Sequence, residues 1–122
     1  MALTADKMQT YRKSMNGERK RILSTIASLH EELGSSLSDE TDENGLETHL
    51  GDVATVTFLR ERDLSIEEHE ERILSDIDAA LKRMQLGTFG DCDECRQPIP
   101  ENRLQALPWA AHCITCQESL DH

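Results

Sequence analysis

Residues 92–95 read Cys-Asp-Glu-Cys and residues 113–116 read Cys-Ile-Thr-Cys, and these two short stretches decide the fold of the C-terminal part. Seventeen residues separate the pairs, a C-x2-C-x17-C-x2-C spacing typical of a four-thiolate zinc site. Two residues between cysteines let a tight turn aim both sulfur atoms at one point, and the longer spacer returns the chain to complete a tetrahedron. We therefore predict one zinc ion bound by Cys92, Cys95, Cys113 and Cys116.

Two disulfide bonds, or free redox thiols, are the alternatives for these cysteines. Disulfides need an oxidising compartment, and residues 1–7 lead into polar sequence without the apolar stretch of a signal peptide. We therefore expect a cytoplasmic protein whose cysteines are reduced. Four protein ligands leave no open position for water, so the zinc is expected to be structural. His112, next to Cys113, is expected at the surface and not on the metal.

Composition and charge limit the partners. Only four of the 122 residues are aromatic, so we do not expect a large globular core. The net charge is -11; residues 37–52 hold six acids and no Lys or Arg, and residues 88–122 hold six acids against two arginines. A zinc finger that binds nucleic acid needs cations to displace counterions from phosphates, so direct DNA or RNA binding is not expected. No apolar run approaches the ~18 residues that a membrane span requires.

The N-terminal segment carries apolar residues at three- and four-residue steps, the pattern of a coiled-coil seam. These residues are Met8, Tyr11, Met15, Ile22, Ile26, Leu29 and Leu33. We predict a helix over residues 4–35, with Thr4 as its N-cap and Gly34-Ser35-Ser36 closing it. Residues 35–48 form an acidic connector with a turn signal at Asn44-Gly45, and we expect residues 37–46 to be a solvated loop.

A second helix is predicted over residues 52–86 because another apolar stripe follows the same spacing. Its members are Val56, Leu59, Ile66, Ile73, Ile77, Ala80 and Met84. Two stripes joined by a polar connector fold most economically as an antiparallel hairpin. We therefore predict a mainly α fold: a long antiparallel two-helix coiled-coil hairpin (residues 1–87) followed by a small C-terminal four-cysteine zinc ribbon (residues 88–122).

Three sequence motifs resemble those of the DksA/TraR family of bacterial zinc-finger transcription factors. They are Gly-Thr-Phe-Gly-Asp-Cys at 87–92, Asn-Arg-Leu-Gln-Ala-Leu-Pro at 102–108 and Cys-Ile-Thr-Cys-Gln-Glu at 113–118. The resemblance covers residues 49–118 by motif and the first helix by architecture. It implies a non-enzymatic regulator that binds RNA polymerase and inserts its coiled-coil tip, here about residues 37–54, into the secondary channel without touching DNA.

The family's tip motif is Asp-x-x-Asp-x-Ala, and the aligned run here is His49-Leu50-Gly51-Asp52-Val53-Ala54. Asp52 and Ala54 match, whereas His49 replaces the first aspartate. The resemblance thus implies a polymerase-binding tip made of His49, Asp52 and Ala54. Taken without the resemblance, Asp52 is predicted to be the N-cap of the second helix.

Two departures from the family pattern limit what it implies. Some members bind the alarmone ppGpp through basic residues at positions that here are His69, Asp76 and Gln117. A tetraphosphate needs cationic or N–H donors, so we do not expect ppGpp to bind there. Arg96 stands where the family usually has Gly in a turn of positive φ, and we expect either mild strain or a slightly altered turn there.

The alternative function is a zinc- or thiol-based stress or redox sensor, in which cysteine oxidation releases the metal and unfolds the finger. An enzyme is not expected. The sequence has no His-x-x-x-His pair on a helix, no Gly-rich phosphate loop and no nucleophile–base pair.

Overall fold

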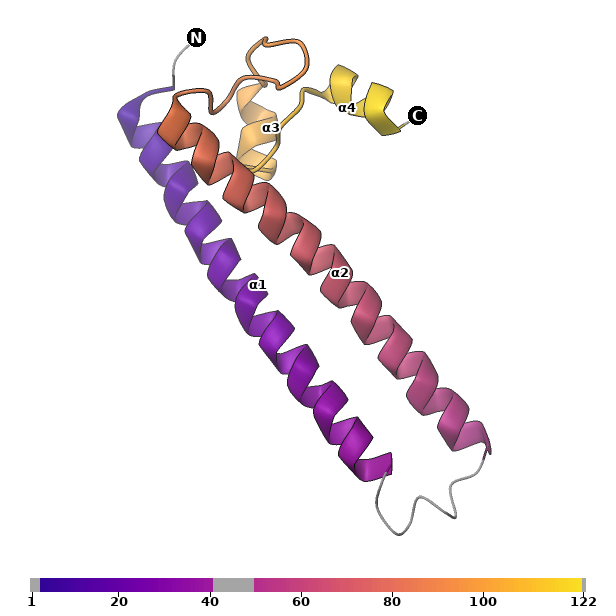
Figure 1. Ribbon diagram of the computed structural model, residues 1–122. Helices are drawn as coiled ribbons and strands as arrows, with labels where there is room; N and C mark the ends of the chain where they lie inside the picture. Colours follow the sequence, from indigo (N-terminus) through magenta and orange to yellow (C-terminus); the bar gives the residue numbers. More distant parts are fainter. Residues whose placement is uncertain (1–2, 41–49, 122) are drawn as a thin grey trace. The chain divides into compact units, whose positions relative to one another are not determined.

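The computed structural model describes residues 3–40 and 50–121, with the side chains of residues 32–40 and 50–52 left aside. Its elements follow the order α1 (Ala5–Glu40), α2 (Leu50–Leu86), α3 (Glu101–Ala106) and α4 (Ile114–Asp121) (Figure 1). In the described residues no strand forms, and Asp91 and Pro98 make a single antiparallel bridge. The predicted mainly α fold with a C-terminal four-cysteine cluster is confirmed. None of the described helices is long and apolar enough to cross a membrane.

The pairing of α1 with α2 is antiparallel. Arg19 contacts Asp78 (Nε to Oδ1, 2.9 Å), Arg21 contacts Glu70 (Nη2 to Oε2, 3.3 Å), and His30 contacts Glu67. Residues farther along α1 therefore pair with residues nearer the start of α2. The predicted two-helix hairpin is confirmed by this order.

The contacts divide the chain into two compact units. The first, which we call the finger unit, comprises Met1–Lys20 and Ile73–His122, and the second, the middle unit, comprises Arg21–Arg72. Each unit contains a stretch of both long helices, and each has its own section of the seam.

The seam of the finger unit is apolar, as the three- and four-residue spacing predicts. Tyr11 and Met15 on α1 are buried together with Ile77, Ala80 and Met84 on α2. Burying a side chain the size of Ile77 contributes roughly 1.5–3 kcal/mol, so these residues account for much of the stability of this part of the hairpin.

The seam of the middle unit differs from the predicted stripe. Ile22 and Leu29 on α1 are buried, but Leu59 and Ile66 on α2 are 40% and 38% exposed, and Asp63 is the buried residue at 7%. The prediction that Leu59 and Ile66 lie in the seam is therefore wrong. On α2 of this unit, Asp63 is buried and the Glu67 and Glu70 side chains are 13% exposed, and this register turns Leu59 and Ile66 toward the flank.

The helix boundaries follow local chemistry in most places. The Thr4 hydroxyl accepts a hydrogen bond from the Lys7 N–H (3.2 Å), so the predicted N-cap is confirmed. At the other end of the hairpin, α2 ends at Leu86 as predicted; Gly87 follows with φ 79°, and the Thr88 N–H donates to the Arg83 carbonyl (3.0 Å). This is the Schellman closure, in which a glycine adopts the left-handed conformation without Cβ strain.

Two boundaries near the connector were predicted incorrectly. α1 continues through Gly34, Ser35 and Ser36 to Glu40, because a helix-interior glycine costs only about 1 kcal/mol and no proline interrupts the hydrogen-bond ladder. α2 begins at Leu50, so Asp52 is its third residue and not the N-cap. The rest of the predicted solvated loop, residues 41–46, lies outside the described residues.

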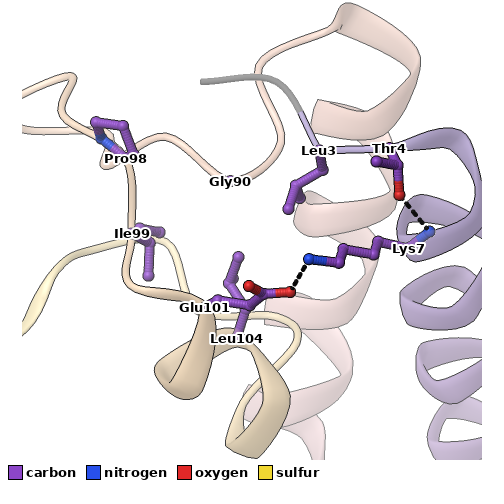
Figure 2. A pocket seen from close by; sticks show the side chains of 8 residues that line it. All are labelled: Leu3, Thr4, Lys7, Gly90, Pro98, Ile99, Glu101 and Leu104. Atoms are coloured by element: carbon purple, nitrogen blue, oxygen red, sulfur yellow. Dashed lines mark hydrogen bonds and ion pairs between the residues drawn. The ribbon is translucent and has the colours of Figure 1, made fainter.

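The end of the hairpin continues directly into the finger loop within the finger unit. Phe89 and Gly90 follow α2, and the Gly90 carbonyl accepts a hydrogen bond from the Ile99 N–H (2.7 Å). Leu3, preceding α1, approaches Gly90 and Leu104 in the same region (Figure 2). Gly90 has φ 92°, and a Cβ there would lie only 3.2 Å from Leu3 Cδ1, so this position requires glycine.

The buried seam of the finger unit yields a stability prediction. Ile77→Asp places an unpaired charge at a position with 0% exposure, and we expect the free energy of unfolding to fall by about 3–5 kcal/mol. Ile66→Asp makes the same chemical change on an exposed flank and should cost about 1 kcal/mol or less. Urea unfolding followed by far-UV circular dichroism measures both variants, and equal losses would contradict the seam described above.

Candidate metal centre

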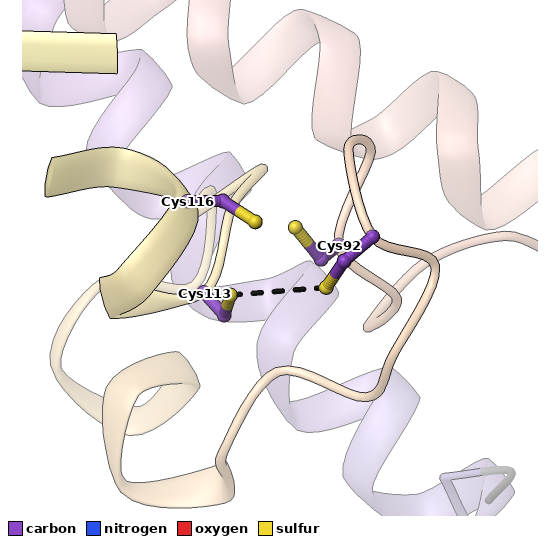
Figure 3. A group of neighbouring side chains, drawn as sticks. Cys92, Cys113 and Cys116 are labelled. Atoms are coloured by element: carbon purple, nitrogen blue, oxygen red, sulfur yellow. Dashed lines mark hydrogen bonds between the residues drawn. The ribbon is translucent and has the colours of Figure 1, made fainter. Parts of the chain in front are cut away.

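The four cysteines converge although 17 residues separate their pairs in the sequence. All four Sγ atoms lie within 4.8 Å of one another, and Cys95 Sγ is 3.9 Å from Cys113 Sγ. Figure 3 shows the sulfur atoms of Cys92, Cys113 and Cys116 turned toward a common point. Four sulfurs at ~2.3 Å from one tetrahedral zinc would be ~3.8 Å apart. The cluster therefore fits a zinc ion, and the four cysteines form no disulfide.

The first cysteine pair sits in a hydrogen-bonded knuckle. The Cys92 N–H donates to the Gln97 carbonyl (2.8 Å), and the Arg96 N–H donates back to the Cys92 carbonyl (3.0 Å). This tight turn needs a left-handed residue, which Arg96 supplies with φ 63°. Of the two alternatives expected for Arg96, strain or an altered turn, the structure shows the left-handed conformation, which is strained for a non-glycine residue.

The second pair is placed by the start of α4. Cys113 precedes this helix, and its carbonyl accepts a hydrogen bond from the Gln117 N–H (2.9 Å). Cys116 is the third residue of α4, so the first helical turn brings both sulfurs to the same side. The two knuckles are joined by the Asp93 N–H, which donates to the Ala111 carbonyl (2.9 Å).

The electrostatics of the cluster favour a bound cation. Backbone N–H groups, led by that of Cys95, donate toward the Cys92 sulfur and lower the pKa of Cys92 to about 6. Hydrogen bonds with the Cys113 and Cys92 side chains raise the pKa of Cys116 to about 12. Without a cation, the Cys92 thiol ionises readily, while the Cys116 thiol stays protonated at neutral pH. Zinc binding must therefore release protons, and we expect zinc affinity to fall as the pH is lowered.

Two arginines hold the second knuckle in place, and sequence reasoning did not identify them. Arg83 on α2 donates from Nη2 to the carbonyls of Trp109 (3.5 Å) and Ala110 (3.4 Å). Arg103 on α3 donates from Nε to the His112 carbonyl (2.9 Å). Their signal in the sequence is weak, because a basic residue in the last turn of a helix is usually explained by the helix dipole alone.

The structure describes His112, Asp52 and Ala54 but not His49. His112 lies outside the sulfur cluster, with its imidazole Nε2 4.0 Å from Glu94 Oε1. Ala54 is exposed on α2, as a contact residue must be, and Asp52 lies in the first turn of the same helix. His49 lies outside the described residues, so the predicted tip is only partly visible.

Comparison with known proteins identifies the family. Residues 87–122 match the model of the prokaryotic dksA/traR C4-type zinc finger. The chain is 31% identical over 128 residues to general stress protein 16O of Bacillus subtilis, covering 99% of this chain and 72% of that protein. It is 30% identical over 111 residues to the RNA polymerase-binding transcription factor DksA of Haemophilus influenzae, covering 88% of this chain and 69% of that protein.

The chain belongs to the DksA/TraR family. A solved structure of transcription factor DksA2 from Pseudomonas aeruginosa superposes with a TM-score of 0.77 at 26% identity, covering 96% of this chain and 84% of that one. The chain spans only 46% to 57% of the length of three other relatives. The family zinc finger and the sulfur cluster together show that this member carries one structural zinc.

The metal centre yields a prediction on zinc removal. Purified protein should hold one zinc per chain, and a strong chelator should unfold the finger before the middle unit, because only the finger depends on the metal for closure. Metal analysis gives the stoichiometry, and amide hydrogen exchange gives the order of loss. Far less than one zinc with oxidised thiols would contradict it.

The strained knuckle yields a second prediction. Arg96→Gly removes a side chain from a left-handed residue, and we expect it to raise finger stability by up to about 1 kcal/mol after the entropy cost of glycine. Chelator titration of zinc affinity measures the gain. Gln97→Gly, at the next and exposed position, is the matched control and should not tighten zinc binding.

Proposed function

We propose that this protein is a non-enzymatic bacterial transcription regulator that binds RNA polymerase and inserts its coiled-coil tip into the secondary channel. The observation that carries the proposal is the similarity, across 88% of the chain, to a protein described as an RNA polymerase-binding transcription factor. The paired long helices are consistent with it, since a hairpin is the part that would enter a channel. Such a regulator works beside the polymerase, and we place it in the cytoplasm.

The zinc has a structural role in this proposal. We assign Cys92, Cys95, Cys113 and Cys116 as its four ligands, which leaves no open position for water or substrate. The finger, proposed as a domain over residues 88–122, then fixes the base of the hairpin over residues 1–87. Arg83 supports this role, because it links the last turn of α2 to the loop before the second cysteine pair.

The proposed polymerase-binding tip comprises His49, Asp52 and Ala54. Asp52 belongs to an acidic stretch, because residues 37–52 hold six acids and no Lys or Arg. Such a stretch is attracted to basic protein surfaces and repelled by nucleic acid. We therefore propose contact with the polymerase protein and no specific binding to DNA.

Nucleotide control through the family's positions is not part of the proposal. Asp76 and Gln117 line one cavity of about 430 Å³ in the finger unit, together with Arg103. Burial raises the pKa of Asp76, and the nearby Arg83 and His112 side chains oppose that rise. A carboxyl group at this wall repels a tetraphosphate, and Arg103 already donates its Nε proton to His112. The Haemophilus influenzae relative, described as an RNA polymerase-binding transcription factor, supports polymerase binding over the zinc- or thiol-based sensor alternative.

The tip prediction uses a nearly isosteric change. Asp52→Asn should abolish the effect on in vitro transcription while polymerase binding stays within about tenfold, or ~1.4 kcal/mol, since most of the contact area would lie along the hairpin. Asn and Asp are alike in size and both are tolerated at helix starts, so the fold should persist. Pull-down of purified RNA polymerase and transcription at saturating protein measure the two effects.

Glu61→Gln is the matched control for this experiment. It removes the same charge from an exposed position of the same helix, and transcription should respond as it does to the wild-type chain. If Asp52→Asn left the transcription effect unchanged, the tip assignment would be wrong. If neither the wild-type chain nor the two variants bound RNA polymerase, the proposed function itself would be wrong.

A further inference from the structure

The beginning of the chain touches the zinc finger at three successive points. Leu3 lies against Gly90 and lines a cavity together with Leu104, and Lys7 Nζ forms an ion pair with Glu101 Oε1 (2.5 Å), as Figure 2 shows. One helical turn further along α1, the rings of Tyr11 and Phe89 lie 5.9 Å apart between centroids, in a tilted arrangement. All of these residues belong to the finger unit. We call residues 3–11 the N-terminal clasp.

The clasp contacts both sides of the first cysteine knuckle. On one side, Phe89 and Gly90 lead within two residues to Cys92. On the other side, Glu101 opens α3 two residues after Ile99, whose N–H donates to the Gly90 carbonyl (2.7 Å). The knuckle closes through the bond from the Cys92 N–H to Gln97, between these two sides. The clasp therefore touches the segments that must stay together for Cys92 and Cys95 to face the metal.

The finger itself offers little apolar surface to keep those segments together. Phe89, Ile99 and Leu104 are its large buried hydrophobic residues apart from the cysteine. The clasp packs against Phe89 through Tyr11, and its residues Leu3 and Lys7 line one cavity with Ile99 and Leu104. Small domains of this kind need an added constraint to fold. The constraint here has two parts, zinc on one side of the knuckle and the clasp on the other.

We propose that the N-terminal clasp positions the zinc centre: Leu3, Lys7 and Tyr11 hold the first knuckle closed and thereby slow zinc release. Because coupling between two stabilising contacts is reciprocal, bound zinc in turn holds the first turns of α1 against the finger. The clasp residues touch no ligand sulfur and act through Phe89, Gly90 and Glu101. The proposal rests on the zinc site and is independent of polymerase binding.

The parts of the clasp should contribute unequally. The Lys7–Glu101 pair is 50% and 41% exposed on its two sides, and exposed pairs contribute little. Glu101 nevertheless raises the pKa of Lys7, through their hydrogen bond first and their charges second, so the pair is formed at neutral pH. Leu3 covers apolar surface, and its loss should have the larger effect.

Zinc release to excess chelator, followed by absorbance, tests the proposal on the full zinc-loaded chain. We expect Leu3→Asp to release zinc about fivefold or more faster, and Lys7→Glu or Glu101→Lys about two- to threefold faster. The double variant Lys7→Glu with Glu101→Lys restores the pair in reverse and should return the rate toward that of the wild type. A general loss of stability would not be rescued in this way.

Two control variants separate the clasp from other effects. Lys13→Glu makes the same charge change at an exposed position of α1 and should leave zinc release unchanged. Leu29→Asp disturbs a buried residue of the middle unit and should unfold that unit more easily without speeding zinc release. If Leu29→Asp accelerated release as much as Leu3→Asp, the effect would be general and the proposal would be wrong.

The reciprocal effect has its own readout. Zinc removal should increase amide hydrogen exchange in residues 5–20 by more than in residues 21–31, because only the former share a unit with the finger. Unchanged exchange in residues 5–20 after complete zinc removal would overturn the proposal, as would wild-type release rates in both Leu3→Asp and Lys7→Glu.

Discussion

The convergence of four cysteine sulfurs is the constraint on which the C-terminal part of this protein depends. The sulfurs lie within 4.8 Å of one another, and four thiolates at that separation repel one another unless a cation sits among them. Around them the finger buries only a few apolar side chains, so hydrophobic burial alone cannot close its loops. The metal is therefore part of the fold. The glycines, arginines and clasp contacts around it position the two knuckles so that all four sulfurs can bind one ion.

The two long helices pack through different kinds of side chain in the two units. In the finger unit the seam is apolar and includes Met15 and Ile77, both at 0% exposure. In the middle unit α2 turns Asp63, Glu67 and Glu70 inward, and two of these carboxylates pair with His30 and Arg21 on α1. Charged seam pairs add less stability than apolar ones, but they penalise wrong registers, because a slipped register leaves a partly buried charge unpaired. The apolar seam of the finger unit thus adds stability, and the charged pairs of the middle unit, beside the buried Ile22 and Leu29, also select the alignment of its two helix segments.

Sequence reasoning found features whose chemistry is local. The cysteine spacing, the Thr4 cap and the end of α2 at Gly87 each depend on a few neighbouring residues, and all three were predicted. The placement of Leu59 and Ile66 was not, because a three- and four-residue stripe allows two adjacent registers and only the partner helix selects one. The Lys7–Glu101 contact could not be predicted at all, since residues far apart in sequence meet through tertiary packing that leaves no periodic signal.

The charges of the finger also decide what kind of finger this is. Residues 88–122 contain two cations, Arg96 and Arg103, against six acids. Arg103 is committed to the His112 carbonyl through its Nε, and Arg96 holds a turn next to the metal with φ 63°. A finger that reads nucleic acid needs several cations aimed at phosphates, and residues 88–122 carry only these two arginines. Arg103 instead supports the backbone just before Cys113. This charge balance agrees with the proposal that the protein contacts the polymerase and does not bind DNA specifically.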